Sequence, residues 1–223
     1  MRVLVACERT GRVRDALLAR GHDAISCDIE PTDVPGPHIQ GDVRPLLKER
    51  WDMVIAHPEC TYLANSAAKH LYVGQRRWNP DGTENPLDPE RVRECAEAAA
   101  FFLECLNANA PRVAVENPVM HWLAIALTRT SDPKQTVQPW WFGDRTFKAT
   151  TFRLRGLKPL RETNRLVPPP PGSDEHKKWS WVFRGPPGPN RKRIRSATQP
   201  GIAEAMAEQW AADDLVSLME AAE

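Results

Sequence analysis

The stretch Trp51-Asp-Met-Val-Ile-Ala-His-Pro-Glu-Cys-Thr-Tyr-Leu63 decides the fold. Residues 53–56 form a short apolar run with β-branched residues at its centre, which predicts a buried strand. The strand has to end at His57-Pro58, because proline lacks the N–H that a ladder needs and restricts the residue before it. Cys60 therefore lies in the loop just beyond the carboxyl end of a strand, where parallel α/β sheets place ligands and chemistry.

Two further segments repeat this pattern of a strand that ends in polar residues. Val113-Ala-Val-Glu-Asn-Pro118 is an apolar strand that ends in the carboxylate of Glu116 and the amide of Asn117. Residues 2–7 form a strand that runs into a polar turn at 8–11. Each feature alone has an ordinary explanation, since most cysteines are small buried hydrophobes and asparagine is a common turn residue. Their order along one chain favours a functional site.

The remaining elements follow from periodicity and from proline and glycine positions. Strands alternate with helices, which predicts an α/β fold with a doubly wound, mostly parallel sheet. We expect strands at 2–7, 23–28, 53–56, 112–116, 136–143 and 149–154, and helices at 13–20, 44–49, 89–108, 120–127 and 201–222.

Two segments depart from this alternation. Residues 63–89 form a long polar stretch, and a loop of that length in a compact domain is usually functional or mobile. Residues 157–199 are rich in proline, basic residues and tryptophan. We therefore expect a core at 1–156, a small irregular basic excursion at 157–199, and a helix in 200–223 that packs back on the core.

Composition limits the partners and the compartment. The 223 residues carry a net charge of only +1, so an argument for nucleic acid has to be local. Five cysteines, an odd number without disulfide spacing, suit reduced thiols in a cytoplasm. The sequence shows no apolar run long enough for a membrane span, no signal peptide and no metal-binding cluster, so we expect neither a membrane nor a metal partner.

The ordered set of motifs resembles the DNA cytosine-5 methyltransferases, and is most similar to a short, phage-type branch of that family. The set consists of the first strand with its turn, Cys27-Asp-Ile-Glu30, Gly41-Asp-Val43, Pro-Glu-Cys-Thr and Glu-Asn-Pro, and it covers residues 2–160 and the last helix. The resemblance implies a Rossmann-like methyltransferase fold that methylates cytosine C5 in DNA with low sequence specificity. For a phage-encoded protein, the compartment would be the bacterial host cytoplasm.

The turn after the first strand limits the cofactor. Gly11 is its only glycine, whereas dinucleotide-binding turns need three glycines around a pyrophosphate, which argues against NAD and ATP. The resemblance implies S-adenosylmethionine, with Glu30 or Asp28 on the ribose hydroxyls and Asp42 on the adenine amino group; the alternative is that these are ordinary loop or capping acids. The full set that the resemblance implies for the cofactor is Ala6, Cys7, Glu8, Gly11, Asp28, Ile29, Glu30, Asp42 and Pro58.

The resemblance also implies the chemistry. The Cys60 thiolate would add to cytosine C6 and make C5 nucleophilic, splitting one hard step into two. Glu116 would stabilise protonation at N3, and Asn117 would hold the loop geometry. Glu59 stands where the family usually has a small neutral residue; its carboxylate would raise the pKa of Cys60 by like-charge repulsion unless it points away.

The resemblance implies that DNA binds a reduced recognition segment. The part of the sequence where the family has its recognition domain contains only residues 157–198 here. Basic and aromatic residues there combine phosphate pairing with stacking surface, although a charge run is often only a solvated face. Residues 63–88 would close over an extruded cytosine, and Lys148 either contacts base or phosphate or is solvated. The nucleic-acid set is Lys69, Arg76, Arg77, Lys148, Lys177, Lys178, Trp179, Arg191, Arg193 and Arg195.

Two other functions stay open at this point. The first keeps the chemistry but uses a free pyrimidine nucleotide or single-stranded DNA, because the recognition segment is so short. The second is a non-catalytic nucleic-acid-binding relative, which Glu59 and the glycine-poor turn would suit. The target site and the oligomeric state are not encoded in any recognisable motif.

Overall fold

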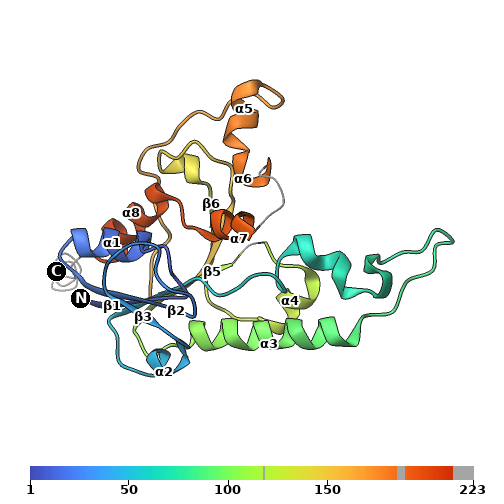
Figure 1. Cartoon of the computed structure of the whole chain (residues 1–223), viewed down its shortest axis with the longest axis horizontal. Coiled ribbons are helices and arrows are strands. Elements are labelled where there is room, and N and C mark those ends of the chain that lie inside the picture. Colours follow the sequence, from blue (N-terminus) through green and yellow to red (C-terminus); the bar gives the residue numbers. More distant parts are fainter. Residues whose placement is uncertain (118, 185–188, 213–223) are drawn as a thin grey trace.

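The computed structural model describes residues 1–117, 119–184 and 189–212, with side chains left out for 189–192. Its centre is a seven-stranded sheet in the order β3-β2-β1-β4-β5-β7-β6 (Figure 1). The first five strands of this order are parallel, and β7 runs antiparallel to β5 and β6. The strands are β1 (Arg2–Ala6), β2 (Asp23–Asp28), β3 (His38–Gln40), β4 (Met53–Ala56), β5 (Arg112–Asn117), β6 (Lys134–Val137) and β7 (Thr150–Arg155).

Helices cover both faces of the sheet. On one face, α1 packs beside α8, and on the other the long helix α3 packs with α2 and α4 (Figure 1). The helices are α1 (Arg12–Ala19), α2 (Arg44–Leu47), α3 (Pro89–Leu106), α4 (Trp122–Leu127), α5 (Asp174–Trp179), α6 (Trp181–Arg184), α7 (Pro189–Ser196) and α8 (Pro200–Gln209).

The central strands are apolar on both sides because both of their faces are covered. In β4 every residue is buried, and its side chains alternate between two cores. Met53 and Ile55 point into the core beneath α1 and α8, whereas Val54 and Ala56 point into the core beneath α3. Phe102 of α3 is fully buried in the second core, and such burial contributes about 2 kcal/mol per large side chain.

This strand order, with one antiparallel strand between β5 and β6, is typical of the S-adenosylmethionine-dependent methyltransferase fold. The predicted fold class, an α/β fold with a doubly wound and mostly parallel sheet, is therefore confirmed. The crossovers place the carboxyl ends of β1, β2, β4 and β5 at one edge of the sheet. In such sheets that edge is where ligands bind.

Three expectations from the sequence are wrong: the ends of one strand and one helix, and the irregular character of one segment. The strand expected over 136–143 ends at Val137, because Pro139 cannot donate to a ladder and opens the 3₁₀ helix η3 (Pro139–Trp141) instead. The helix expected over 201–222 ends at Gln209, and its portion from 213 onward lies outside the described residues. The 157–199 segment, expected to be irregular, contains α5, α6 and α7.

Residues 72–87 form an arm that projects beyond the start of α3 (Figure 1). The arm follows the 3₁₀ helix η1 (Asn65–Leu71), begins with η2 (Val73–Gln75), and is closed by two antiparallel bridges, Tyr72 with Leu87 and Trp78 with Glu84. It ends at Asp88, whose carboxylate accepts from the backbone N–H groups of Glu90 and Arg91 and so caps α3. In the part of the chain that the structure describes, no helix is both long and apolar enough to cross a membrane.

Candidate active site

The strand register aligns the residues that follow the sheet. Ala6 of β1 lies opposite Cys27 of β2 and Ala56 of β4, and Ala56 in turn lies opposite Val115 of β5. The next residue of each strand therefore falls on one line across the carboxyl edge of the sheet. These four residues are Cys7, Asp28, His57 and Glu116.

His57 and Glu116 form a buried pair on this line. His57 directly follows β4, and Glu116 takes the matching register position within β5, so both side chains emerge on the face that α1 and α8 cover. His57 Nδ1 lies 2.7 Å from Glu116 Oε2, with the two side chains 8% and 16% exposed. His57 Nε2 is buried and has no hydrogen-bond partner among the described residues. Sequence reasoning missed His57, although its position between a buried strand and Pro-Glu-Cys was a usable signal.

Glu116 is held in its anionic form. Burial by itself would raise the pKa of this carboxyl group. The positive charge of Lys148 and the hydrogen bond from His57 outweigh burial, and the pKa of Glu116 falls below its ordinary value. The site therefore contains a carboxylate at neutral pH.

Cys60 lies past the same edge with its side chain exposed to solvent. Partial desolvation by the surrounding protein and the negative charge of Glu116 raise the pKa of its thiol, and Lys148 opposes them. Glu59 also raises the pKa of Cys60, as expected from the sequence, but Glu116 contributes more. Glu59 accepts a hydrogen bond from Thr61 Oγ1 at 2.7 Å. The resting thiol is protonated at neutral pH.

Lys148, expected either to contact base or phosphate or to be solvated, has a charge that acts on this site. It lies just before β7, and its ammonium group donates to the backbone carbonyl of Ala197 at 3.0 Å. Its charge acts on both Cys60 and Glu116. Asn117, the last residue of β5, is 6% exposed and lies opposite Thr151 of β7. The structure therefore brings together Cys60, Glu116, Asn117 and Lys148 at one end of the sheet.

Glu8 has a structural task at the other half of the edge. Its side chain is 4% exposed and accepts from the backbone N–H groups of Val13 at 2.8 Å and Arg14 at 3.3 Å. A carboxylate there satisfies free donors at the amino end of α1 and complements its dipole. Glu8 thus holds the turn that leads into α1, and Gly11 permits that turn with a left-handed φ of 71°.

Cys7 directly follows β1 and also has a left-handed backbone, with φ of 57°. A hydrogen bond with Cys105 and burial, followed by the charges of Cys105, Asp28 and Asp42, raise the pKa of its thiol well above the ordinary value. The Cys7 side chain packs against the core beneath α3. Of the other two residues implied for the cofactor near this edge, Ala6 and Pro58 are both buried, so any contact from them is through shape and backbone.

The loops after β2 and β3 carry an apolar side chain among carboxylates. Ile29 is 76% exposed, between Asp28 and Glu30. Asp28 Oδ1 accepts from the Glu30 N–H at 2.9 Å, and Glu30 pairs with Arg9 at 2.5 Å. Asp42 accepts from the Arg44 N–H at 3.0 Å, which lowers the pKa of Asp42. An exposed isoleucine flanked by acids fits a ligand with a flat apolar ring and hydroxyl groups, as in adenosine.

Several of the basic residues expected to bind nucleic acid are paired with acids. Lys177 pairs with Asp174 at 2.7 Å, and Lys178 with Glu175 at 3.3 Å, both on α5. Trp179 is 5% exposed and packs against Phe147, so burial keeps it from offering the stacking surface expected from the sequence.

On α7, Arg193 pairs with Asp33 and Arg195 is exposed, whereas the side chain of Arg191 lies outside the described residues. Lys69, Arg76 and Arg77 are exposed on η1 and the arm. The described residues contain no group of three or more histidine, cysteine, aspartate or glutamate side chains that could hold a metal ion.

Comparisons with known proteins find similarity to solved structures only, and at low identity. No family model and no curated protein matches the sequence. The solved structures that match include an Escherichia coli prophage-encoded protein assigned as a DNA modification methyltransferase (15% identity, TM-score 0.44, 75% of this chain and 51% of that one).

A second is the Entamoeba histolytica methyltransferase EhMeth (13% identity, TM-score 0.37, 74% of this chain and 57% of that one). A third is a mutant of Spodoptera frugiperda DNMT2 (13% identity, TM-score 0.36, 76% of this chain and 55% of that one). The chain spans about half the length of each of these three structures.

Proposed function

We propose that the protein methylates cytosine C5 in DNA through a covalent bond to Cys60, with S-adenosylmethionine as cofactor and with low sequence specificity. The observation that carries this proposal is the pairing of β4 with β5, which sets the loop that holds Cys60 beside the buried Glu116 and its partner His57; the charge of Lys148 acts on both Cys60 and Glu116. A thiol, a buried carboxylate and a cation are the groups that addition to a pyrimidine ring requires.

The cofactor would bind along the ends of β1, β2 and β3. Asp28 or Glu30 would accept hydrogen bonds from the ribose hydroxyls, Ile29 would cover one face of the adenine ring, and Asp42 would accept from its amino group. When bound there, S-adenosylmethionine supplies an electrophilic methyl group. The left-handed backbone at Cys7 and Gly11 gives the sharp turn at the end of β1 beside which such a ligand would lie.

The resting charges set the order of the first step. Because Cys60 is protonated and Glu116 is anionic, the thiol proton has to leave as sulfur bonds to cytosine C6. Glu116 accepts that proton and donates it to N3 of the ring, so the π electrons of the C5–C6 bond shift toward C5. The hydrogen bond from His57 to Oε2 orients Glu116 for this transfer, which makes His57 a positioning residue.

The reaction closes by reversing these bonds. After C5 has gained the methyl group, loss of the C5 proton to solvent reforms the C5–C6 double bond and expels the Cys60 sulfur. N3 returns its proton to Glu116, and Glu116 passes that proton to the Cys60 sulfur, which restores the thiol. Lys148 stabilises the negative charge that Glu116 and the departing sulfur share.

The experiment is transfer of a tritiated methyl group from S-adenosylmethionine to unmodified duplex DNA, followed by nucleoside analysis. We expect label in 5-methylcytosine with the natural protein and none with Cys60→Ala. Cys95→Ala is the matched control, because Cys95 is a buried thiol in α3. Duplex DNA with 5-fluorocytosine should trap an adduct at Cys60, since fluorine at C5 blocks the elimination. Label transfer that survives in Cys60→Ala contradicts the mechanism.

A second substrate class is favoured by the pairing of the basic residues on α5. Lys177 and Lys178 already contact acids, which leaves little free charge there for duplex phosphates. The label-transfer assay therefore includes single-stranded DNA and free dCMP. Label in these and not in duplex DNA would move the proposal to the second class. DNA binding without cofactor binding would instead indicate a non-catalytic relative.

A further inference from the structure

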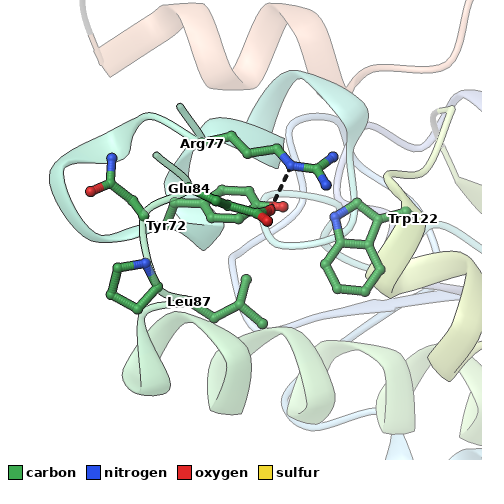
Figure 2. Close-up of a pocket in the computed structure, with 7 residues that line it drawn as sticks. Tyr72, Arg77, Glu84, Leu87 and Trp122 are labelled. Carbon is green, nitrogen blue, oxygen red and sulfur yellow. Dashed lines mark hydrogen bonds and ion pairs between the residues drawn. The ribbon is translucent and has the colours of Figure 1, made fainter. Parts of the chain in front are cut away.

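A pocket separates the arm from α4, and the active-site chemistry does not use it (Figure 2). Its volume of about 560 Å³ is within the range of small-molecule sites. It is lined by Tyr72, Arg77, Glu84, Asn85, Pro86, Leu87 and Trp122.

The arm has a defined conformation at this pocket. The side-chain amides of Asn79 and Asn85 donate to each other, at 3.1 Å and 2.9 Å. The Asn85 N–H also donates to the Arg77 carbonyl at 2.8 Å, and Val73 N–H donates to the Pro86 carbonyl at 3.0 Å. These bonds fix the two limbs of the arm relative to each other, so the walls of the pocket are formed before any ligand arrives.

The apolar wall of the pocket is an uncovered indole. Trp122 is the first residue of α4, and its side chain is 49% exposed and turned toward Arg77 (Figure 2). Leu87, which is 38% exposed and lies at the end of the arm next to α3, adds to the apolar surface of the pocket. An exposed indole is a platform on which a nucleobase stacks, and such stacking is strong enough to matter for binding single strands.

The polar wall is a guanidinium group held in one orientation. Arg77 Nε donates to Glu84 Oε1 at 2.8 Å, and the guanidinium carbon lies 5.2 Å from the ring centre of Trp78 and 5.8 Å from that of Tyr72. Glu84 uses the Nε donor, and the terminal nitrogens of Arg77 have no hydrogen-bond partner among the described residues. Two parallel donors of this kind match the O6 and N7 acceptors of guanine.

We propose that this pocket binds an unpaired guanine base of the nucleic acid that the protein modifies, stacked on Trp122 and held at O6 and N7 by Arg77. This inference rests on the proposed function, because it assigns a second contact to the same substrate. Such a pocket would give a preference for one base without a large recognition domain, since one base outside the helix is read by one pocket. A base can enter only from a single strand or from an opened duplex, and opening a duplex costs a few kcal/mol.

Other occupants fit less well. An acidic peptide would pair with Arg77 but would leave the Trp122 indole uncovered and would meet the carboxylate of Glu84. Adenine carries an amino group where guanine has O6, and that group would face the donors of Arg77. The pocket therefore discriminates between the two purines as well as between nucleic acid and peptide.

The test is fluorescence anisotropy with short labelled single-stranded oligonucleotides that differ at one position, carrying guanine, 7-deazaguanine or adenine. We expect guanine to bind roughly tenfold more tightly than adenine, with 7-deazaguanine between them because it lacks the N7 acceptor. Trp122→Ala should weaken all three alike by roughly tenfold. In Arg77→Gln the three affinities should become equal.

Arg76→Gln is the matched control. Arg76 neighbours Arg77 on the arm and is exposed, but it does not line the pocket. Loss of its charge should lower the affinity for every oligonucleotide by the same factor and keep the guanine preference. Equal effects of Arg76→Gln and Arg77→Gln, or equal binding of guanine and 7-deazaguanine by the unmodified protein, would overturn the inference. The second comparison needs no variant and so does not depend on folding of a mutant.

The two proposals fail separately. Label transfer that depends on Cys60, together with binding that ignores the test base, rejects the guanine pocket and leaves the reaction standing. Base-dependent binding that Arg77→Gln abolishes, without any label transfer, supports the pocket and rejects the reaction. Absence of binding to every oligonucleotide rejects the pocket, and label transfer to dCMP then reports on the reaction alone.

Discussion

His57 Nδ1 and Glu116 Oε2 lie 2.7 Å apart at the ends of adjacent parallel strands, with both side chains largely buried. The contact follows from the register of β4 and β5, in which Ala56 lies opposite Val115. A carboxylate placed this way depends on its neighbour for orientation as well as for charge.

His57→Phe should raise the pKa of Glu116, because the hydrogen bond from His57 is one of the contacts that lower it. A carboxyl group with a lowered pKa is anionic down to more acidic pH, so its protonation should begin at higher pH in the variant. The measurement is an NMR titration of ¹³C-labelled glutamate carboxyl groups, with Glu116→Gln to assign the signal. His57→Gln keeps a donor and should restore much of the natural titration; an unchanged titration in His57→Phe would contradict the assignment.

The thiol of Cys60 should react faster with iodoacetamide in Glu116→Gln than in the natural protein. The negative charge of Glu116 raises the pKa of Cys60, so its removal increases the thiolate fraction at pH 8. Lys148→Met should act in the opposite direction, since Lys148 lowers that pKa. Mass spectrometry of the modified peptide measures each alkylation rate. We expect the rate of each variant to differ severalfold from that of the natural protein. Slower alkylation in Glu116→Gln would show that the two side chains do not interact as described.

Gly11→Ala should destabilise the protein more than Gly21→Ala, although both glycines have left-handed backbones. At Gly21 nothing lies within 4 Å of an added Cβ, so only backbone strain of about 1 kcal/mol applies. At Gly11 the added atom would meet the guanidinium of Arg14 and the side chain of Val34. Arg14 is fully buried, and the total cost should be roughly 2–4 kcal/mol. Urea unfolding of both variants tests the difference; equal losses would refute it.

Ile29→Asp should weaken binding of S-adenosylmethionine about tenfold and leave the free energy of unfolding within about 0.5 kcal/mol of the natural value. The reason is that Ile29 is 76% exposed and so contributes little to the core. Isothermal titration calorimetry measures the affinity, and Val167→Asp, at an 89% exposed position of the 157–173 segment, is the control. Unchanged cofactor affinity in Ile29→Asp would place the adenine ring elsewhere.

The sheet could be predicted from the sequence because its strands are short, apolar and bounded by proline or glycine. Residues 53–56 are the clearest example, since all four are buried and Pro58 limits the strand. The helix-to-strand alternation then indicated the winding of the sheet, and the observed pairing of β4 with β5 sets Glu116 beside His57. Periodicity could not give the end of α8 at Gln209, because the apolar spacing continues beyond it.

The site was harder to predict where a polar residue has a structural partner. Glu8 looked available for a ligand, yet it caps α1, and Trp179 looked like a stacking surface, yet it is buried against Phe147. The cap by Glu8 is local and depends on the left-handed turn at Gly11, whereas the contact of Trp179 with Phe147 forms only through tertiary folding, which local pattern does not report. The partnership of His57 with Glu116 spans 59 positions and was missed for the same reason.

The pairing of α1 with α8 has a consequence for synthesis of the chain. The Arg12 guanidinium donates to the carbonyl of Thr198 at 2.6 Å across 186 positions, and Met206 lies in the same core as Val13 and Leu17. A nascent chain on the ribosome therefore exposes the part of one apolar sheet face that α8 covers until residues 198–210 emerge. Such a face favours aggregation, so a chaperone that shields it during translation should increase the yield of folded protein.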